Sequence, residues 1–187
     1  VEYRPIPKYF QPAQPHKNNL QLPVDLFAEI SESEKPLVTA FHYVDDLGKV
    51  SADNFTFKAT IQNHFDDRWA VCQNMRIFIL ATDGAIVIPF SKIGCSSELF
   101  LKINEIMTNG KVHDLSALSA DFSTPQEIEL RAQEQDLSIW IEGKEVYRQK
   151  YEDAMGTFVG LRFKFEGIGE VLNFQILDQN GEEVVLP

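Results

Sequence analysis

Apolar and polar residues alternate with a period of two along most of the chain from residue 37 onward. In residues 55–61, four apolar side chains alternate with Thr56, Lys58 and Thr60. Residues 158–165 follow the same pattern. Such alternation is typical of a β-strand with one face in a core and the other in water. We therefore expect Arg162 and Lys164 to face solvent and the following residues to be buried: Phe55, Phe57, Ile61, Ile77, Ile79, Leu161, Phe163 and Phe165.

Turn signals separate several of these apolar runs. Residues 75–80 and 85–90 flank Thr82-Asp83-Gly84, and residues 137–141 and 145–147 flank Glu142-Gly143-Lys144. Short Gly-containing turns between two β-rich runs are typical of antiparallel hairpins. A helical period is weak throughout, and residues 99–107 are the best candidate for a short helix. Many short strands with regular turns predict an all-β sandwich.

Proline divides the chain into two unequal parts. Six of the nine prolines lie in residues 1–36, whereas every glycine lies at Gly48 or later. Proline fixes its own φ and moves the preceding residue out of the helical region, so residues 3–16 are expected to be extended. This segment is either a linker or an arm, and its apolar residues favour an arm that packs on the domain. We therefore divide the chain into a Pro-rich arm or linker at 1–36 and a β-sandwich domain at 37–187.

Composition narrows the class of protein and its partners. The chain has 187 residues, 44% of them hydrophobic, and carries 17 Lys and Arg against 28 Asp and Glu, a net charge of -11. This length and composition suit one globular domain. The negative field repels phosphate backbones, so nucleic acid is not an expected partner. No apolar run is long enough to cross a bilayer, and any signal peptide or anchor would lie outside this sequence.

Two cysteines, Cys72 and Cys95, stand 23 positions apart without an accompanying His cluster. This spacing fits neither a zinc site nor a CxxC redox pair. From the spacing alone, one disulfide and two buried thiols both remain open.

The second half of the chain resembles a known family. Residues 137–148 (LSIWIEGKEVYR) resemble the element of a hydrophobic strand, x-Gly-Lys and a return strand in concanavalin A-like and laminin G-like jelly rolls. Residues 155–177 resemble the closing strands of these domains, and the likeness extends over about residues 53–178. With a Pro-rich stretch before the domain, the pattern also resembles membrane-anchored proteins of the Bacteroidetes phylum. The resemblance implies a jelly-roll sandwich of two antiparallel sheets.

The same resemblance bears on the cysteines. It places Cys72 at the start of the strand before the Asp83-Gly84 hairpin and Cys95 just after the return strand. A hairpin brings its outer ends together, so the resemblance implies a Cys72–Cys95 disulfide. An oxidising, extracytoplasmic location would accompany it.

Catalytic and metal motifs are weak in this sequence. Glucanases of the same superfamily have a strand resembling Glu-x-Asp-x-x-Glu, and here Glu127 and Glu129 alternate without a third carboxylate at the required distance. We therefore do not expect an enzyme. Asp45-Asp46 and Asp66-Asp67 are acidic pairs in predicted loops, where solvated turn residues are the plainer interpretation. No cofactor is expected, and calcium would need further oxygen ligands from elsewhere.

Two aromatic residues are candidate ligand contacts. Trp69 stands close to Asp66 and Arg68, a set that suits the apolar face and the hydroxyls of a sugar, although Trp69 packed at a strand end with Arg68 paired to Asp66 would give the same pattern. Trp140 lies between Ile139 and Ile141. It would be on an outer face if both isoleucines point to the core, unless the strand is buried on both faces.

These observations predict an extracytoplasmic, non-catalytic binding module, with carbohydrate as the expected ligand. A cell-envelope protein-interaction or scaffold domain is the alternative, and a glycoside hydrolase comes third. The expected partner is thus a glycan or a cell-envelope protein, and contact with a membrane would come only through an anchor outside this sequence.

Overall fold

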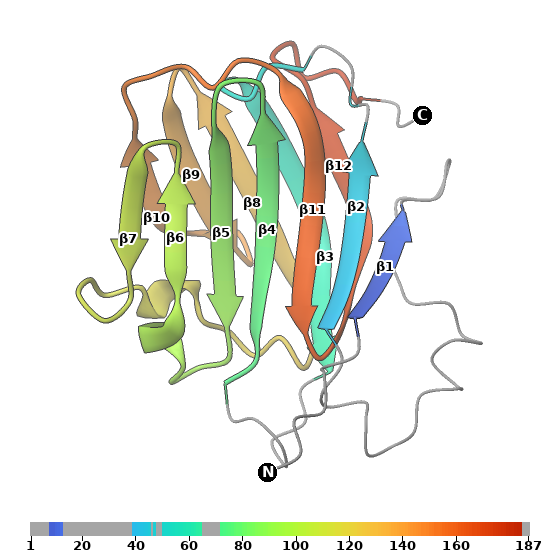
Figure 1. The fold of residues 1–187 in the computed structure, drawn as a ribbon, viewed down its shortest axis with the longest axis vertical. Helices are drawn as coiled ribbons and strands as arrows, with labels where there is room; N and C mark the ends of the chain where they lie inside the picture. Colours follow the sequence, from blue (N-terminus) through green and yellow to red (C-terminus); the bar gives the residue numbers. More distant parts are fainter. Residues whose placement is uncertain (1–7, 13–38, 46, 48–49, 65–71, 185–187) are drawn as a thin grey trace.

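Two β-sheets packed face to face form the molecule (Figure 1). The computed structural model describes residues 8–12, 39–45, 47, 50–64 and 72–184. The seven-stranded sheet has the order β1 (Lys8–Pro12), β2 (Thr39–Asp45), β11 (Phe158–Glu166), β4 (Asn74–Ala81), β5 (Ala85–Ser91), β6 (Phe100–Ile103) and β7 (Ile106–Asn109). The five-stranded sheet has the order β10 (Lys144–Lys150), β9 (Asp136–Ile141), β8 (Gln126–Gln133), β3 (Phe55–His64) and β12 (Ile168–Leu177).

The chain crosses between the two layers at both ends of the sequence. Strand β3 leaves the first sheet after β2, and β4 returns to it, while β11 and β12 again lie in opposite sheets. Between these crossings, β4 to β7 and β8 to β10 form two antiparallel meanders. This interleaved order is that of a jelly-roll sandwich, so the predicted fold class is confirmed.

Strand β1 lies within the segment predicted as a Pro-rich arm or linker. It pairs with β2 in parallel and forms one edge of the seven-stranded sheet. The remainder of residues 1–36 lies outside the described residues, so the division of the chain at residue 36 stays a prediction.

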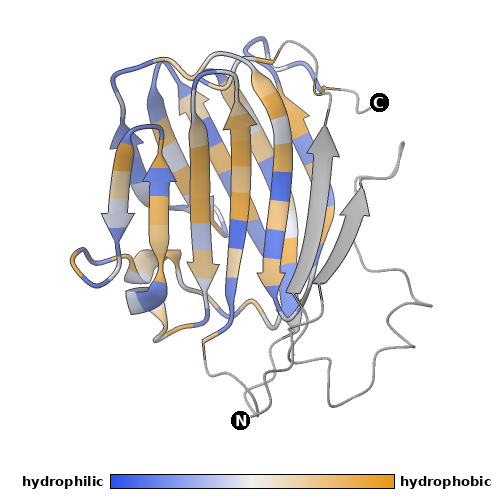
Figure 2. Cartoon of the chain, in the orientation of Figure 1, coloured by the Kyte–Doolittle hydropathy of each residue, from blue (hydrophilic) through white to orange (hydrophobic). Residues whose placement is uncertain are grey.

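The core fills the space between the sheets. All eight residues expected to be buried are at most 3% exposed. The rings of Phe57 in β3 and Phe163 in β11 lie 6.0 Å apart between centroids and join the two layers. Figure 2 shows the alternation of apolar and polar positions along the strands. Arg162 is exposed, as predicted, whereas Lys164, which was also expected to face solvent, is half-buried.

The helix expected at residues 99–107 is wrong. These residues form the hairpin of β6 and β7, with Leu101 and Ile103 each 1% exposed and Phe100 on the outer side. Over so short a run, the two- and 3.6-residue periods are hard to separate, and pairing of β6 with β5 decides the structure. Asn104 takes the left-handed conformation (φ 51°) that the turn requires. In the described residues, helical structure is limited to the short turns η2 (Ser96–Glu98) and η3 (Ser116–Leu118).

A disulfide joins Cys72 and Cys95, as the family resemblance implied, with 5.5 Å between their Cα atoms. Asn74 pairs with Ser91 at the outer end of the β4–β5 hairpin. The two cysteines follow directly beyond this pair, so the register of the hairpin brings them together. None of the described helices is long and apolar enough to span a membrane.

A candidate ligand-binding site around Trp140

Trp140 emerges on the outer face of the five-stranded sheet. Its neighbours Ile139 and Ile141 are 0% and 7% exposed and point into the core, while the Trp140 side chain is half-buried. The strand is therefore not buried on both faces at this position. The other predicted contacts, Trp69, Asp66 and Arg68, lie outside the described residues, as do Asp46 and Asp67.

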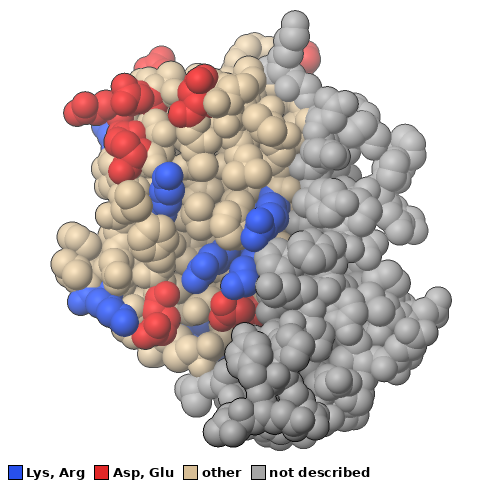
Figure 3. Space-filling view, viewed as in Figure 1, with Lys and Arg blue, Asp and Glu red and all other residues tan. Residues whose placement is uncertain are grey.

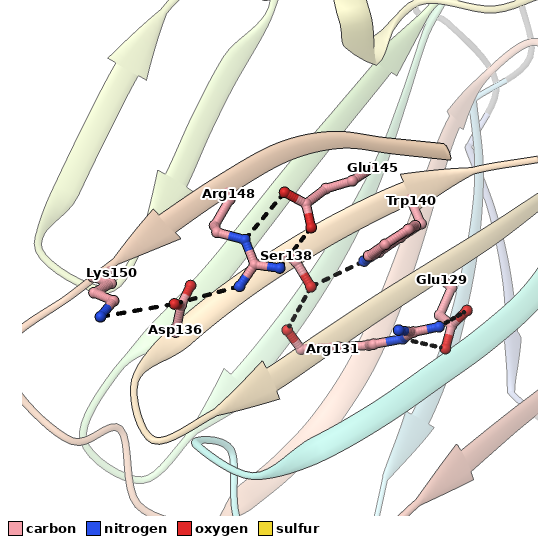
Figure 4. Close-up of polar contacts among 8 residues, drawn as sticks. All are labelled: Glu129, Arg131, Asp136, Ser138, Trp140, Glu145, Arg148 and Lys150. Atoms are coloured by element: carbon pink, nitrogen blue, oxygen red, sulfur yellow. Dashed lines mark hydrogen bonds and ion pairs between the residues drawn. The ribbon is translucent and has the colours of Figure 1, made fainter. Parts of the chain in front are cut away.

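Antiparallel register gathers polar side chains around Trp140 in three rows across β8, β9 and β10. Trp140 pairs with Glu129 on one side and Glu145 on the other. The next row contains Arg131, Ser138 and Arg148, and the third contains Asp136 and Lys150. Neighbours on one face of a sheet are close enough to contact each other. We call the following eight residues the Trp140 cluster (Figure 4): Glu129, Arg131, Asp136, Ser138, Trp140, Glu145, Arg148 and Lys150.

Two contacts hold the indole ring in place. Nε1 of Trp140 donates a hydrogen bond to Oγ of Ser138 at 3.0 Å. The guanidinium carbon of Arg131 lies 4.7 Å from the centroid of the ring, which is a cation–π geometry. Trp140 and the stacked guanidinium of Arg131 therefore form one wall, in which the guanidinium covers part of the ring.

Guanidinium–carboxylate pairs flank this wall on both sides. Arg131 donates from Nε and Nη2 to the two carboxylate oxygens of Glu129, at 2.7 and 2.9 Å. Arg148 makes the same two-pronged contact with Glu145. Hydrogen bonds from Arg131 lower the pKa of Glu129, and those from Arg148 lower the pKa of Glu145. Both carboxylates are therefore held in the ionised form at neutral pH.

A hollow of about 350 Å³ opens beside the ring. It is lined by Trp140, Ser138 and the charged side chains of Arg131, Asp136, Arg148 and Lys150, with Gln133 and Glu134 at its end. Oδ2 of Asp136 lies 3.4 Å from Nη1 of Arg148 and 4.0 Å from Nζ of Lys150. The other oxygen, Oδ1, is buried and accepts no hydrogen bond in the structure. The hollow thus combines an aromatic wall, cations and an acceptor that lacks a donor.

A second hollow, of about 380 Å³, lies on the other side of Glu129. Polar side chains from β3, β8 and β12 line it, including Lys58, Thr60, Glu127 and Gln175. Nζ of Lys58 is 3.5 Å from Oε1 of Glu129, so the pair of Glu129 and Arg131 stands between the two hollows. Such neighbouring depressions on one sheet face suit a ligand longer than one small ring.

Sequence reasoning proposed Trp140 as a ligand contact but did not name the residues around it. The alternation that predicts strands also places Glu127, Glu129 and Arg131 on one side of residues 126–133, and this pattern is the signal that could have found them. Within the described ranges, no group of three or more His, Cys, Asp or Glu side chains converges as a metal site would require. The described residues therefore offer no set of ligands for a calcium ion.

Comparisons with known proteins give matches among solved structures only. No family model matches the chain, and no curated protein matches it either. The carbohydrate binding module CBM66 from Bacillus subtilis is 11% identical with a TM-score of 0.46, and the match covers 67% of this chain and 76% of that one. CG-16, a homodimeric agglutinin from chicken liver, is 12% identical with a TM-score of 0.46 and coverages of 73% and 98%. A GH16 structure from the Bacteroides ovatus mixed linkage glucan PUL, in complex with the product G4G4G3G, is 11% identical with a TM-score of 0.45 and coverages of 73% and 75%.

These names describe the matched proteins only. The fold of this chain is defined by the order of its strands. It has two facing sheets, as the sequence resemblance implied, with β11 between β2 and β4 in one and β3 between β8 and β12 in the other. By this strand order, the chain is an all-β jelly-roll sandwich.

Proposed function

We propose that the protein is a non-catalytic carbohydrate-binding module and that the Trp140 cluster is its binding site. One observation carries the proposal: a half-buried indole, fixed by Ser138 and Arg131, borders a hollow that is also lined by Asp136, whose buried Oδ1 has no hydrogen-bond donor. Binding sites for small polar ligands combine an aromatic surface with a few positioned polar groups in this way.

The chemistry of the hollow matches that of a sugar ring. A sugar offers an apolar C–H face, which packs against the wall of Trp140 and Arg131. Its hydroxyl groups both donate and accept hydrogen bonds. A hydroxyl that donates to Oδ1 of Asp136 would remove the cost of a buried acceptor without a partner, and Arg148 would donate to a neighbouring hydroxyl. Lys150, whose side chain is 81% exposed, has room to move aside and admit the ligand to Asp136.

The electrostatics of the cluster favour binding over catalysis. Glycoside hydrolysis needs one carboxyl group that carries a proton near neutral pH, and this requires a raised pKa. Arginine contacts instead lower the pKa of both Glu129 and Glu145. Recognition would use these side chains directly, without a cofactor.

An extracytoplasmic location is part of the proposal. The Cys72–Cys95 disulfide supports it, because disulfides persist mainly in oxidising compartments. Attachment to a membrane would come from a segment outside this sequence.

A glycan array with the full chain tests the function, followed by calorimetric titration of each glycan retained. We expect Trp140→Ala to weaken binding at least about tenfold, a change of roughly 1.4 kcal/mol. Trp140→Phe keeps a ring but loses the hydrogen bond to Ser138, so an intermediate effect is expected. Lys111→Ala, in an exposed loop away from the cluster, is the matched control and should bind normally. Failure to retain any glycan, or unchanged affinity in Trp140→Ala, would contradict the proposal.

A further inference from the structure

Large apolar side chains are exposed on the outer face of the seven-stranded sheet. Leu80, Phe100, Met107 and Val159 are 41%, 39%, 64% and 52% exposed. They come from β4, β6, β7 and β11, which lie in one sheet (Figure 1). Single exposed apolar residues are ordinary, but a group of them on one face marks an interaction site.

Positive charge accompanies this apolar surface. Arg76, Lys102, Arg162 and Lys164 belong to the same strands, and Glu166 is the only acidic residue in β4, β5, β6, β7 and β11. Figure 3 shows blue side chains set within a mostly uncharged surface, with acidic side chains toward its margins. Because the chain as a whole carries a net charge of -11, this face has the opposite sign to the rest of the molecule. We call the following residues the basic apolar face: Arg76, Phe78, Leu80, Val87, Phe100, Lys102, Met107, Val159, Arg162 and Lys164.

Register arranges these residues in a row that crosses five strands. Cross-strand partners run in the order Arg162, Phe78, Val87, Lys102 and Met107. The guanidinium carbon of Arg162 lies 4.7 Å from the ring centroid of Phe78. Two cations thus stand at a fixed separation with two apolar side chains between them.

A neighbouring row brings two cations, Arg76 and Lys164, side by side. Arg76 is the direct cross-strand partner of Lys164, and like charges in this position destabilise a sheet. Nζ of Lys164 lies 3.0 Å from Oε1 of Glu166, whereas Nε of Arg76 is buried and has no hydrogen-bond partner. Because two cations lie side by side here, an anionic group at the surface of this row would reduce their repulsion.

We propose that the basic apolar face docks an acidic protein segment, whose carboxylates contact the cations and whose aliphatic side chains cover the apolar residues between them. Phenylalanine, methionine and arginine are enriched at protein interfaces. Aliphatic side chains such as Leu80 and Val87 offer nothing to the hydroxyls of a glycan. A second copy that used the same face would place cations against cations, which charge complementarity disfavours.

The geometry also sets the spacing of the carboxylates in the partner. From β11 to β6 there are three strand intervals, so Arg162 and Lys102 are separated by about 14 Å at roughly 4.8 Å per interval. An extended segment that crosses the strands rises about 3.3 Å per residue. Acidic residues at positions i and i+4 of such a segment would match this separation, and both would lie on one side of it.

Fluorescence anisotropy with labelled synthetic peptides and the full chain tests the proposal. One peptide carries two glutamates at i and i+4 with valine and leucine between them. A second has the glutamates adjacent, and a third has serine in place of the aliphatic residues. We expect the first to bind at least about tenfold more tightly than either of the others. The double variant Lys102→Glu/Arg162→Glu should lose this binding at least tenfold, while Lys144→Glu, the same type of charge change at an exposed position of the opposite sheet, should retain it.

Three results would overturn the proposal. If the serine peptide or polygalacturonate binds as well as the first peptide, the face is a general polyanion site that serves acidic glycans. If the chain forms dimers in sedimentation that the double variant abolishes, the occupant is a second copy. Absence of binding by every peptide would also exclude this segment chemistry. Trp140→Ala should leave peptide binding unchanged, so the outcome is independent of the proposed glycan site on the opposite sheet.

Discussion

The hydroxyl of Tyr151 donates a hydrogen bond to Oδ1 of Asp53 at 2.9 Å, across a separation of 98 residues. The Asp53 carboxylate is buried and also accepts from the backbone N–H groups of Met155 and Gly156. Asp53 precedes β3 in one sheet, and Gly156 precedes β11 in the other. One carboxylate therefore satisfies donors of a loop that closes one end of the sandwich.

Removing this carboxylate should destabilise the fold more than removing its tyrosine partner. Asp53→Ala leaves a buried hydroxyl and two backbone N–H groups without an acceptor, and we expect a loss of about 3 to 5 kcal/mol in the free energy of unfolding. Tyr151→Phe removes one donor and should cost about 1 to 2 kcal/mol. Urea denaturation of both variants measures the difference. An effect of Asp53→Ala no larger than that of Tyr151→Phe would show that the backbone contacts contribute little.

Alkaline pH should lower the stability of the fold through Tyr151. Burial raises the pKa of Tyr151, and the hydrogen bond to Asp53 and its negative charge raise it further. Folding thus favours the neutral phenol. This contribution is fully present below the ordinary tyrosine pKa of about 10 and is lost as pH rises above that value toward the higher folded pKa. Thermal melting between about pH 8 and 11 should show a steeper decline for the wild type than for Tyr151→Phe, and parallel curves would exclude this linkage.

Removing the disulfide should lower stability without changing the fold. The Cys72–Cys95 bond closes a loop with a sequence separation of 23, and a loop of that size contributes roughly 3 kcal/mol in the chain-entropy model. Cys72→Ser/Cys95→Ser is expected to lose about that amount in urea denaturation, with an unchanged circular dichroism spectrum. Titration of the unreduced wild type in denaturant should find no free thiol, and two thiols would contradict the bond.

The core position with the clearest expected effect is Phe163, whose side chain is 0% exposed. Its ring centroid lies 6.0 Å from that of Phe57 and 6.4 Å from that of Phe174, both in the opposite sheet. Phe163→Ala should therefore cost about 3 to 5 kcal/mol through lost packing and a residual cavity. Its neighbour Arg162 points outward, so Arg162→Ala should change stability by only about 1 kcal/mol or less. Similar losses in the two variants would contradict the assigned faces.

Local patterns predicted strands and faces because alternation is a property of each strand alone. The isoleucines around Trp140 placed its side chain outside, and Thr82-Asp83-Gly84 placed the β4–β5 turn, from neighbouring residues only. The short run at 99–107 failed because its structure depends on pairing with β5.

The residues that surround Trp140 and those that form the basic apolar face also depend on pairing between strands that are far apart in the sequence. Arg76 meets Lys164 only because β11 lies beside β4, and a single sequence does not specify that order. Around Trp140, the contacts with Glu145 and Arg148 follow from the hairpin that was predicted. Those with Glu129 and Arg131 required the register of β8 against β9.

Arg131 should shield the ring of Trp140 from solvent, and quenching of tryptophan fluorescence can measure this. The sequence has two tryptophans, so Trp69→Phe leaves Trp140 as the single tryptophan. In that background, Arg131→Ala removes the guanidinium that lies 4.7 Å from the ring centroid, and acrylamide should quench the emission more strongly. Stability should fall by only about 0.5 to 1 kcal/mol, because the cation–π contact is exposed.

Lys58→Ala is the matched control for this variant. Lys58 contacts the same carboxylate, Glu129, at 3.5 Å, but no contact places it over the indole ring. It should therefore leave quenching unchanged. Equal quenching in the two variants would mean that loss of charge near Glu129, and not removal of the stacked guanidinium, controls access to Trp140. A bound glycan should protect the ring in both variants, because its C–H face would take the exposed part of the same wall.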